Sequence, residues 1–477
     1  MQKLIFASRL LLAMLLYIGS AVSQTKATVE TIAVDLSCPR CNVIFLDIDL
    51  LRADFIRSKN EAYTPNINKF FKSSIRFNDV SAVSGVTAIS NMSTLTGRDG
   101  FFTYSLLKNT YVDTPPQMPR KYGRLYAGLP TIAETLRNNG YRTVNVNHGY
   151  YAGKQMLLDR GFETYWGTGE VDSLTNFPGH AIRKSTEYIS DFAGSKAPFF
   201  LLLRSEDLRG LPYRFPFNRK RLEDTRIDYR AIGTDYYEIV YQLRSDGKPT
   251  VDFPSYPRAA WMNKAQLAEY EKLSKKLYGQ QLSYLDEELG HLFEGLKASG
   301  TMDRTIIVLY SNHGDGLYDN GIPNHGVSFQ SCVSVPILIR HPKVKFAMNI
   351  DAPVALIDLV PTVYQMLNVE SKSTHDGISL VDHMVKEKPL PERIFFGVDR
   401  ESQYVRKGGM KLIAWADRSL ELYDIKNDPT EMINLKDRFP ILVSELEELL
   451  AEHELSSLDQ ALQLLLRDKR MGSSRVQ

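Results

Sequence analysis

The sequence has 477 residues, of which 43% are hydrophobic and 24% are charged, a balance typical of globular proteins that excludes an intrinsically disordered chain. Its 58 basic and 56 acidic side chains give a net charge of +2, which excludes a nucleic-acid binder held by a strongly basic surface. Three cysteines are too few for a disulfide-dense scaffold.

The N-terminus has the pattern of a signal peptide over residues 1–23. Lys3 and Arg9 precede the apolar run Leu10–Ile18, and small residues follow at Ala21–Ser23. The run is shorter than a helix needs to cross a hydrocarbon core of about 30 Å. We therefore expect an exported protein, periplasmic or secreted, without integral membrane association; an uncleaved membrane anchor is the alternative. Residues 24–41 form an N-terminal lead segment.

Two of the three cysteines, Cys38 and Cys41, lie just before the first expected strand. In an oxidising compartment this spacing favours a local disulfide. A thioredoxin-like redox role is less well supported, because that motif follows a strand and begins a helix. Cys332 is left over, and we expect it to be a buried thiol.

Apolar runs alternate with helical patterns between residues 42 and 385. The expected strands are 43–48, 142–147, 198–203, 305–310 and 335–339, and the expected helices begin near residues 64 and 129 and cover 180–192 and 278–296. Continuous apolar strands separated by helices indicate a parallel sheet that is covered on both faces. The sequence therefore predicts an α/β domain over 42–385 with a doubly wound, mostly parallel sheet and helices on both faces. In such sheets the chemistry gathers at the carboxyl ends of the strands.

Two further segments depart from this alternation. Residues 214–260 are rich in Arg, Tyr and Asp and are irregular, which indicates either a substrate-binding lid or a solvated surface insert. Residues 386–455 contain short strand-like runs and predict a small C-terminal α+β subdomain with an antiparallel sheet. A helix is expected over 440–467, and residues 456–477 form a helical, basic tail.

Polar side chains follow the first and a later expected strand. Asp47 and Asp49 end the first strand, where alternation puts both carboxylates on one face. Such a pair is costly in an apolar segment unless a cation or hydrogen-bond donors compensate it, and strand-end caps are the alternative. Asn312 and His313 follow the strand 305–310, so Asp49, Asn312 and His313 form a candidate site for one divalent cation. Oxygen ligands favour Ca²⁺ or Mg²⁺, and imidazole also suits Zn²⁺ or Mn²⁺.

Thr87 lies at the start of a helix-like stretch that ends at Gly97. Free backbone N–H groups and the helix dipole favour an anion at such a helix start. A hydroxyl there becomes a nucleophile if a metal lowers its pKa. An ordinary N-cap is the alternative.

Taken in order, these segments resemble the sulfatase family of the alkaline phosphatase superfamily. The matching segments run through almost the whole chain after residue 23: Ile48–Asp54, Ser93–Arg98, Gly140–Thr143, Arg160–Phe162, Tyr284–Glu287, Ser311–Asp315, Val335–Ile337, Asp351–Thr362, Asp376–Leu380 and Glu421–Leu435. The resemblance implies a doubly wound α/β core, one divalent cation, and attack on sulfate or phosphate esters.

The chain departs from the family pattern at its reactive positions. The family's nucleophile is a Cys or Ser converted to formylglycine, whereas this chain has Thr87, which cannot yield an aldehyde. The arginine four residues later is Asn91, and the usual metal aspartate before His313 is Asn312. Asp47 is the residue that we expect to restore the lost charge.

The resemblance also points to three residues near the ester anion: His148, Arg209 and His325. They would bind the anion and protonate the leaving group. A surface or structural role is the alternative for each of them.

We therefore expect an exported, metal-dependent hydrolase of small-molecule or glycan sulfate or phosphate esters, with Thr87 as its nucleophile. Catalysis would also use His325, His148 and Arg209; Asn91, His325 and Arg209 would bind substrate; the metal ligands would be Asp49, Asn312, His313 and Asp47. Ca²⁺ is the expected ion, with Mg²⁺, Mn²⁺ and Zn²⁺ as alternatives.

The rival hypotheses are a degenerate fold that only binds an anionic glycan or polymer, and a phosphodiesterase or phosphoryl transferase. A phosphoethanolamine-type transferase fits less well, because such relatives carry several membrane helices.

Overall fold

The computed structural model describes residues 34–57, 61–108, 111–112, 122–149, 152–167, 179–208, 263–386 and 388–473. The expected signal peptide, the insert 214–260 and Arg209 lie outside these ranges. The elements below all belong to the unit Asp35–Gln477. In the described part of the chain, every helix is too short or too polar to span a bilayer.

The main sheet has eight strands in the order β11-β2-β10-β9-β1-β8-β6-β7. Their bounds are β1 Asn42–Ile48, β2 Ile75–Phe77, β6 Arg142–Asn147, β7 Thr164–Gly167, β8 Phe199–Ser205, β9 Thr305–Tyr310, β10 Ile337–Arg340 and β11 Met348–Ile350. β1 lies between β8 and β9 and is parallel to both, whereas β10 runs antiparallel to β9 and β2. All seven residues of β1 are buried, as its continuous apolar run predicted. The mostly parallel sheet is confirmed.

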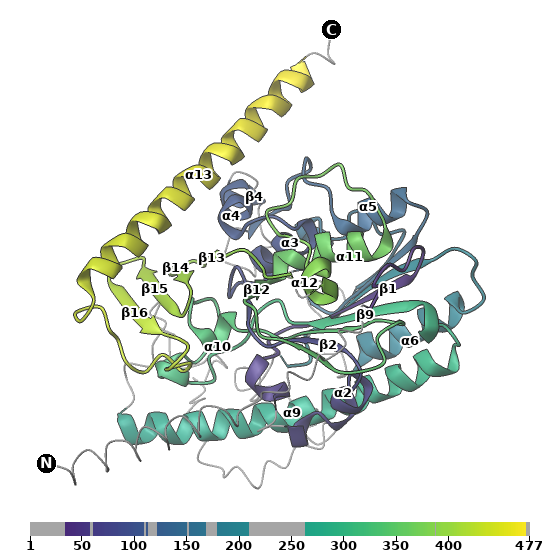
Figure 1. Ribbon diagram of the computed structural model, residues 1–477, viewed down its shortest axis with the longest axis horizontal. Coiled ribbons are helices and arrows are strands. Elements are labelled where there is room, and N and C mark those ends of the chain that lie inside the picture. Colours follow the sequence, from purple (N-terminus) through teal and green to yellow (C-terminus); the bar gives the residue numbers. More distant parts are fainter. Residues whose placement is uncertain are drawn as a thin grey trace, which may run out of the picture. The chain divides into compact units, whose positions relative to one another are not determined.

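Helices cover both faces of this sheet (Figure 1). Their bounds are α2 Pro65–Phe70, α3 Thr87–Thr96, α4 Gly100–Lys108, α5 Ile132–Asn138, α6 His180–Phe192, α9 Lys264–Ala298, α10 Gln330–Val333, α11 Leu359–Leu367 and α12 Val381–Lys386. The buried face of α9 packs with α6 and the sheet in one apolar core, which contains Leu46 and Ile307. This face consists of Leu282, Leu285, Leu289, Leu292 and Leu296. α3 and α11 lie on the opposite side of the sheet (Figure 1). Alternation along β1 points Asp47 to the side opposite Leu46, away from that core.

Local sequence explains where these helices begin. Thr131 caps α5, because its hydroxyl accepts from the Glu134 N–H while the Glu134 carboxylate accepts from the Thr131 N–H. Pro65 is the first residue of α2, the position at which its missing N–H costs nothing. The structure also joins Cys38 to Cys41 in a disulfide and leaves Cys332 as a buried free thiol, so both cysteine predictions are confirmed.

Within the described ranges, three smaller sheets accompany the main one. They are β3 Val80–Ser81 with β12 Val354–Ala355, β4 Tyr111–Val112 with β5 Tyr122–Gly123, and the C-terminal sheet of β13 Ile394–Val398, β14 Ser402–Lys407, β15 Met410–Trp415 and β16 Leu420–Asp424. The C-terminal sheet is antiparallel throughout, which confirms the separate sheet expected there. The long helix α13, Pro440–Ser473, follows it and contains the helix predicted over 440–467.

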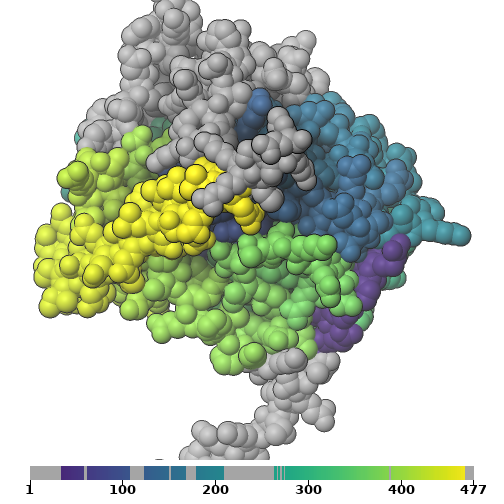
Figure 2. Space-filling view, turned by 90° about the horizontal axis from the view of Figure 1, so that it is seen from above, coloured from purple at the N-terminus to yellow at the C-terminus, as the bar shows by residue number. Residues whose placement is uncertain are grey.

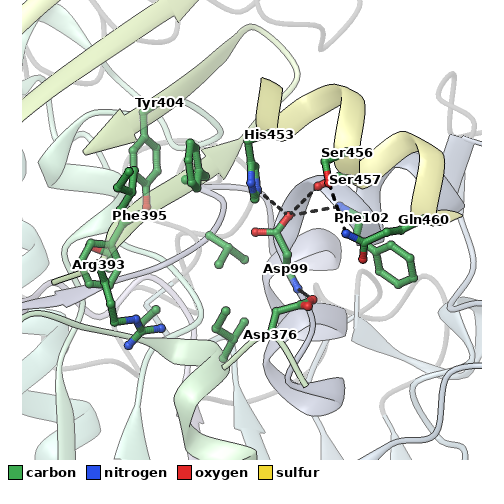
Figure 3. A pocket seen from close by; sticks show the side chains of 16 residues that line it. Asp99, Phe102, Asp376, Arg393, Phe395, Tyr404, His453, Ser456, Ser457 and Gln460 are labelled. Atoms are coloured by element: carbon green, nitrogen blue, oxygen red, sulfur yellow. Dashed lines mark hydrogen bonds and ion pairs between the residues drawn. The ribbon is translucent and has the colours of Figure 1, made fainter. Parts of the chain in front are cut away.

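A small cavity of about 240 Å³ lies where α13 meets α4 and β13 (Figure 3). Beside it, His453 Nε2 lies 3.1 Å from Asp99 Oδ1, and the His453 ring stacks on Phe396 with 3.7 Å between ring centroids. The Asp99 carboxylate also accepts from the Phe101 N–H in the first turn of α4 and from the Ser457 hydroxyl. Asp99 therefore joins α13 to the start of α4.

His453→Ala tests this attachment, because it removes the contact with the Asp99 carboxylate and the ring stack on Phe396. We expect the free energy of unfolding to fall by about 1–2 kcal/mol, measured from the urea midpoint. The neighbouring exposed residue supplies the control: Glu454→Ala should change it by less than about 0.5 kcal/mol. Equal effects of the two substitutions would contradict the role of His453 in attaching α13 to α4.

Candidate functional site at the carboxyl ends of the central strands

A buried charge cluster forms where β1 and β8 end. The register places Arg204 of β8 beside Asp47 of β1. The guanidinium Nε lies 3.4 Å from Asp47 Oδ2, Nη2 lies 3.3 Å from Asp49 Oδ1, and Nη1 donates to Glu206 Oε1 at 2.8 Å. Arg204, Asp47 and Asp49 are all essentially inaccessible to solvent. Three carboxylates thus share one guanidinium, an excess of acidic groups over basic ones.

The environment of Asp47 shows the cost of this excess. Burial raises the pKa of the Asp47 carboxyl to about 7; Asp49 adds to the rise, while Arg204 opposes it. Asp47 Oδ1 accepts from the backbone N–H of Asn312 at 3.2 Å, which ties β1 to the segment that follows β9. Asp47 is therefore held by a cation and a backbone donor that together only partly offset its burial.

The segment after β9 presents a histidine whose tautomer can be read from its contacts. His313 Nδ1 lies 2.9 Å from the carbonyl oxygen of Gly314, which can only accept, so Nδ1 carries the proton. The other ring nitrogen, Nε2, lies 2.9 Å from Thr87 Oγ1, where a neutral ring would accept the Thr87 hydroxyl. The same Nε2 lies 3.5 Å from Asp49 Oδ1. Three atoms expected at the reactive centre therefore meet.

Thr87 is the first residue of α3, which confirms the helix start predicted there. Its side chain is buried. The helix is held against the segment after β9, because the Ser90 hydroxyl donates to the Asn312 carbonyl at 2.6 Å. One turn into α3, the buried Asn91 amide donates to the Thr87 carbonyl at 3.0 Å. Asn91 thus has its amide engaged within the helix.

His325 lies on the more open side of this centre. Its ring stacks on that of His313 with 4.7 Å between centroids, and its Nδ1 lies 3.4 Å from Asp315 Oδ1. About a quarter of the His325 side chain is exposed, whereas His313 is buried. His325 is therefore the ring that a ligand entering from solvent meets first.

His148 follows β6 on the other side of Arg204. Its carbonyl oxygen accepts from Arg204 Nη1 at 3.0 Å, and its Nδ1 lies 3.5 Å from Asp207 Oδ1. Burial alone would lower the pKa of His148, but Asp207 outweighs it and raises the pKa. The next residue, Gly149, has φ +133°, and a Cβ there would collide with the Glu206 carboxylate. His148 is thus placed against the charge cluster, while Arg209 lies outside the described residues.

The ligand set expected for a cation is gathered only in part. In the described ranges, no group of three or more His, Cys, Asp or Glu side chains is arranged to hold a metal. Asp49 and His313 do lie together with the Thr87 hydroxyl. Asn312 Oδ1 accepts from the His313 N–H, and its Nδ2 is buried without a hydrogen-bond partner among the described residues.

The donor chemistry nevertheless fits a divalent cation. Three buried carboxylates share the guanidinium of Arg204, and beside them His313 Nε2 lies 2.9 Å from the Thr87 hydroxyl and 3.5 Å from the Asp49 carboxylate.

Sequence reasoning missed Arg204, Glu206 and Asp315. Arg204 and Glu206 alternate at the end of β8 as Asp47 and Asp49 do at the end of β1, so both pairs share one face of the sheet. This alternation is the sequence pattern from which Arg204 and Glu206 could have been predicted as site residues. Asp315 lay within a segment that the family resemblance covered, but no role was expected for it.

The sequence is similar to those of several sulfatases. The choline-sulfatase of Rhizobium meliloti is 23% identical over 480 residues, covering 90% of this chain and 86% of that protein. A sulfatase of Formosa agariphila is 29% identical over 189 residues, and the chain spans 37% of its length. An N-acetylglucosamine-6-O-sulfatase of Bacteroides thetaiotaomicron is 27% identical over 239 residues, which cover 45% of this chain and 43% of that protein.

Solved structures share the fold. One, a complex with its substrate D-glucosamine-2-N,6-O-disulfate, has a TM-score of 0.61 and 19% identity and covers 88% of this chain and 98% of its own. The phosphonate monoester hydrolase of Agrobacterium radiobacter has a TM-score of 0.62 and 17% identity and covers 88% and 96%. The sulfatase family model matches residues 41–369, more than half of the sequence, and the chain therefore belongs to the sulfatase family.

Proposed function

We propose that this protein is an exported, metal-dependent hydrolase of sulfate esters that uses Thr87 in place of formylglycine. The observation that carries the proposal is the 2.9 Å contact between the Thr87 hydroxyl and His313 Nε2 at the start of α3. Relatives named for sulfate-ester hydrolysis, the choline-sulfatase and the N-acetylglucosamine-6-O-sulfatase, support this chemistry. A small-molecule or glycan sulfate ester is the proposed substrate. The disulfide between Cys38 and Cys41 supports an oxidising, periplasmic or extracellular location.

The sulfatase family generally uses a divalent metal. In this chain Asp49 and His313 would hold it, with Asn312, Asp47 and the Thr87 hydroxyl as further donors, and Ca²⁺ is the ion we propose. Such a cation lowers the pKa of a bound hydroxyl and withdraws charge from the ester oxygens.

The chain's own residues then act on the ester in order. The N-terminus of α3 orients the ester anion toward Thr87, whose hydroxyl loses its proton to solvent as its oxygen attacks sulfur and the ester S–O bond breaks. His325, on the open side, gives a proton to the leaving oxygen, and His148 is placed to contact the anion. Water then hydrolyses the Thr87 sulfate ester and regenerates the hydroxyl. Arg204 keeps the carboxylates of β1 and β8 together throughout.

One observation favours a second candidate function, an anionic glycan or polymer binder that does not turn its ligand over. The Asn91 amide is directed at the Thr87 carbonyl, so the expected arginine is replaced by a neutral group that is engaged within α3. Phosphodiester hydrolysis or phosphoryl transfer through Thr87 is a third candidate, supported by the fold shared with the phosphonate monoester hydrolase. A comparison of turnover with sulfate and phosphate esters separates these three candidate functions.

Thr87→Ala tests the nucleophile. We expect turnover of an aryl sulfate to fall by about a thousandfold or more, because the attacking oxygen is lost, while Thr87→Ser keeps measurable activity. Initial rates are compared for aryl sulfate, aryl phosphate and bis-aryl phosphate with added Ca²⁺, Mg²⁺, Mn²⁺ or Zn²⁺.

The matched control for Thr87→Ala is Thr94→Val in the same helix. The Thr94 hydroxyl is buried without a hydrogen-bond partner among the described residues, so its loss should leave turnover unchanged. No turnover by the wild type above that of Thr87→Ala, combined with retained binding of a sulfated glycan, would replace the enzyme with the binder. A preference for either phosphate ester would favour phosphoryl chemistry.

Added Ca²⁺ should raise the melting temperature of the protein after treatment with a chelator. At a free concentration a hundred times Kd the stabilisation is about 2.7 kcal/mol. Asp49→Asn should abolish the shift, because it removes a charged donor, whereas Glu370→Gln at an exposed position should leave it intact. A wild-type melting temperature that no divalent ion changes would reject the cation.

Asp47 makes stability depend on pH in a direction that can be checked. Because its folded-state pKa is raised from 3.8 to about 7, the folded protein binds this proton more tightly than the unfolded chain does. In chelator, its contribution should therefore weaken as pH rises from about 4 to about 7. Asp47→Asn should be more stabilising, or less destabilising, above that window than below it, measured by urea unfolding. An effect independent of pH would contradict the assignment.

A further inference from the structure

Helix α13 has a second apolar face that no described residue covers. Leu455, Leu458, Leu462 and Leu466 are 67%, 41%, 45% and 54% exposed. Their spacing of three, four and four residues places them in one stripe about 16 Å long. In Figure 2 the yellow surface of α13 lies at the outside of the molecule, beside the yellow-green surface of the C-terminal strands.

The opposite face of α13 already has its partners. Leu446, Leu450, Ser457 and Ala461 are buried there, and His453 contacts Asp99 on the same side. The attachment to α4 therefore does not use the leucine stripe. A helix that is apolar on two opposite faces is typical of one packed between two partners.

The charges along α13 complement those of a second, antiparallel copy of the helix. The sequence of its first two thirds is acidic and that of its end is mainly basic: Glu445, Glu447, Glu448, Glu452, Glu454 and Asp459 are followed by Arg467, Asp468, Lys469 and Arg470. Two such helices laid antiparallel bring acidic segment against basic segment at both ends, whereas a parallel pair sets like charges together.

The leucine spacing fits the same arrangement. Around a two-fold axis near residue 460, Leu458 of one copy meets Leu462 of the other, and Leu455 meets Leu466. A two-fold axis repeats each contact, which is the self-complementary pattern of a symmetric dimer.

We propose that the stripe formed by Leu455, Leu458, Leu462 and Leu466 is the contact surface of a homodimer, in which α13 of one copy packs antiparallel on α13 of a second copy. This inference does not depend on the proposed function. The surface is short, so the dimer dissociates on dilution, as small interfaces do.

Sedimentation velocity of the full chain over a dilution series tests the dimer. We expect the wild type to change from dimer to monomer on dilution, and Leu458→Glu combined with Leu462→Glu to be monomeric throughout with an unchanged far-ultraviolet CD spectrum. Met432→Glu is the matched control, because Met432 is 70% exposed but lies outside the stripe, and it should still dimerise.

Cysteine cross-linking tests the orientation. Under mild oxidation, Leu455→Cys combined with Leu466→Cys should give covalent dimers, whereas Leu455→Cys alone should not, because two copies of that position lie about 16 Å apart in an antiparallel pair. Cys332 is buried and does not interfere.

Three outcomes would overturn the proposal. They are a wild type that is monomeric at every concentration, a dimer that survives the double glutamate variant, and efficient cross-linking by Leu455→Cys alone. A monomer that floats with anionic vesicles through the same leucines would also overturn it and would assign the stripe to a membrane surface.

Discussion

Arg204 compensates the carboxylates that are buried at the ends of β1 and β8, and the rest of the candidate site depends on this compensation. Its guanidinium contacts Asp47, Asp49 and Glu206 at once and so brings one positive charge to three buried carboxylates. Breaking such a buried cluster is far more costly than losing a surface ion pair. Because Arg204 and Asp47 are cross-strand neighbours, the same interaction also stabilises the register of the two central strands.

The reactive centre is assembled outward from this cluster by backbone groups. Asp47 accepts from the Asn312 N–H, the Asn312 carbonyl accepts from Ser90, and the Gly314 carbonyl determines which nitrogen of His313 is protonated. The Thr87 hydroxyl is thus held beside His313 Nε2, at 2.9 Å, by contacts that come from two different segments of the chain.

Much of this could be predicted from single segments of the sequence, because the signals are local. The all-apolar β1, the alternation of Asp47 and Asp49, and the helix start at Thr87 each follow from a few consecutive residues. Arg204 could not be placed in this way, because its partners lie about 150 residues away and a lone arginine after an apolar run looks like a surface residue. The second apolar face of α13 could not be predicted from the sequence either. It is recognised only because the structure buries the opposite face of the helix.

Helix α3 has the candidate nucleophile at one end and, just beyond its other end, the carboxylate that anchors α13. Its ten residues form a helix about 15 Å long. The contacts that hold the C-terminal helix and the residue that would attack the ester are therefore separated by a single short element, although they lie in different parts of the fold.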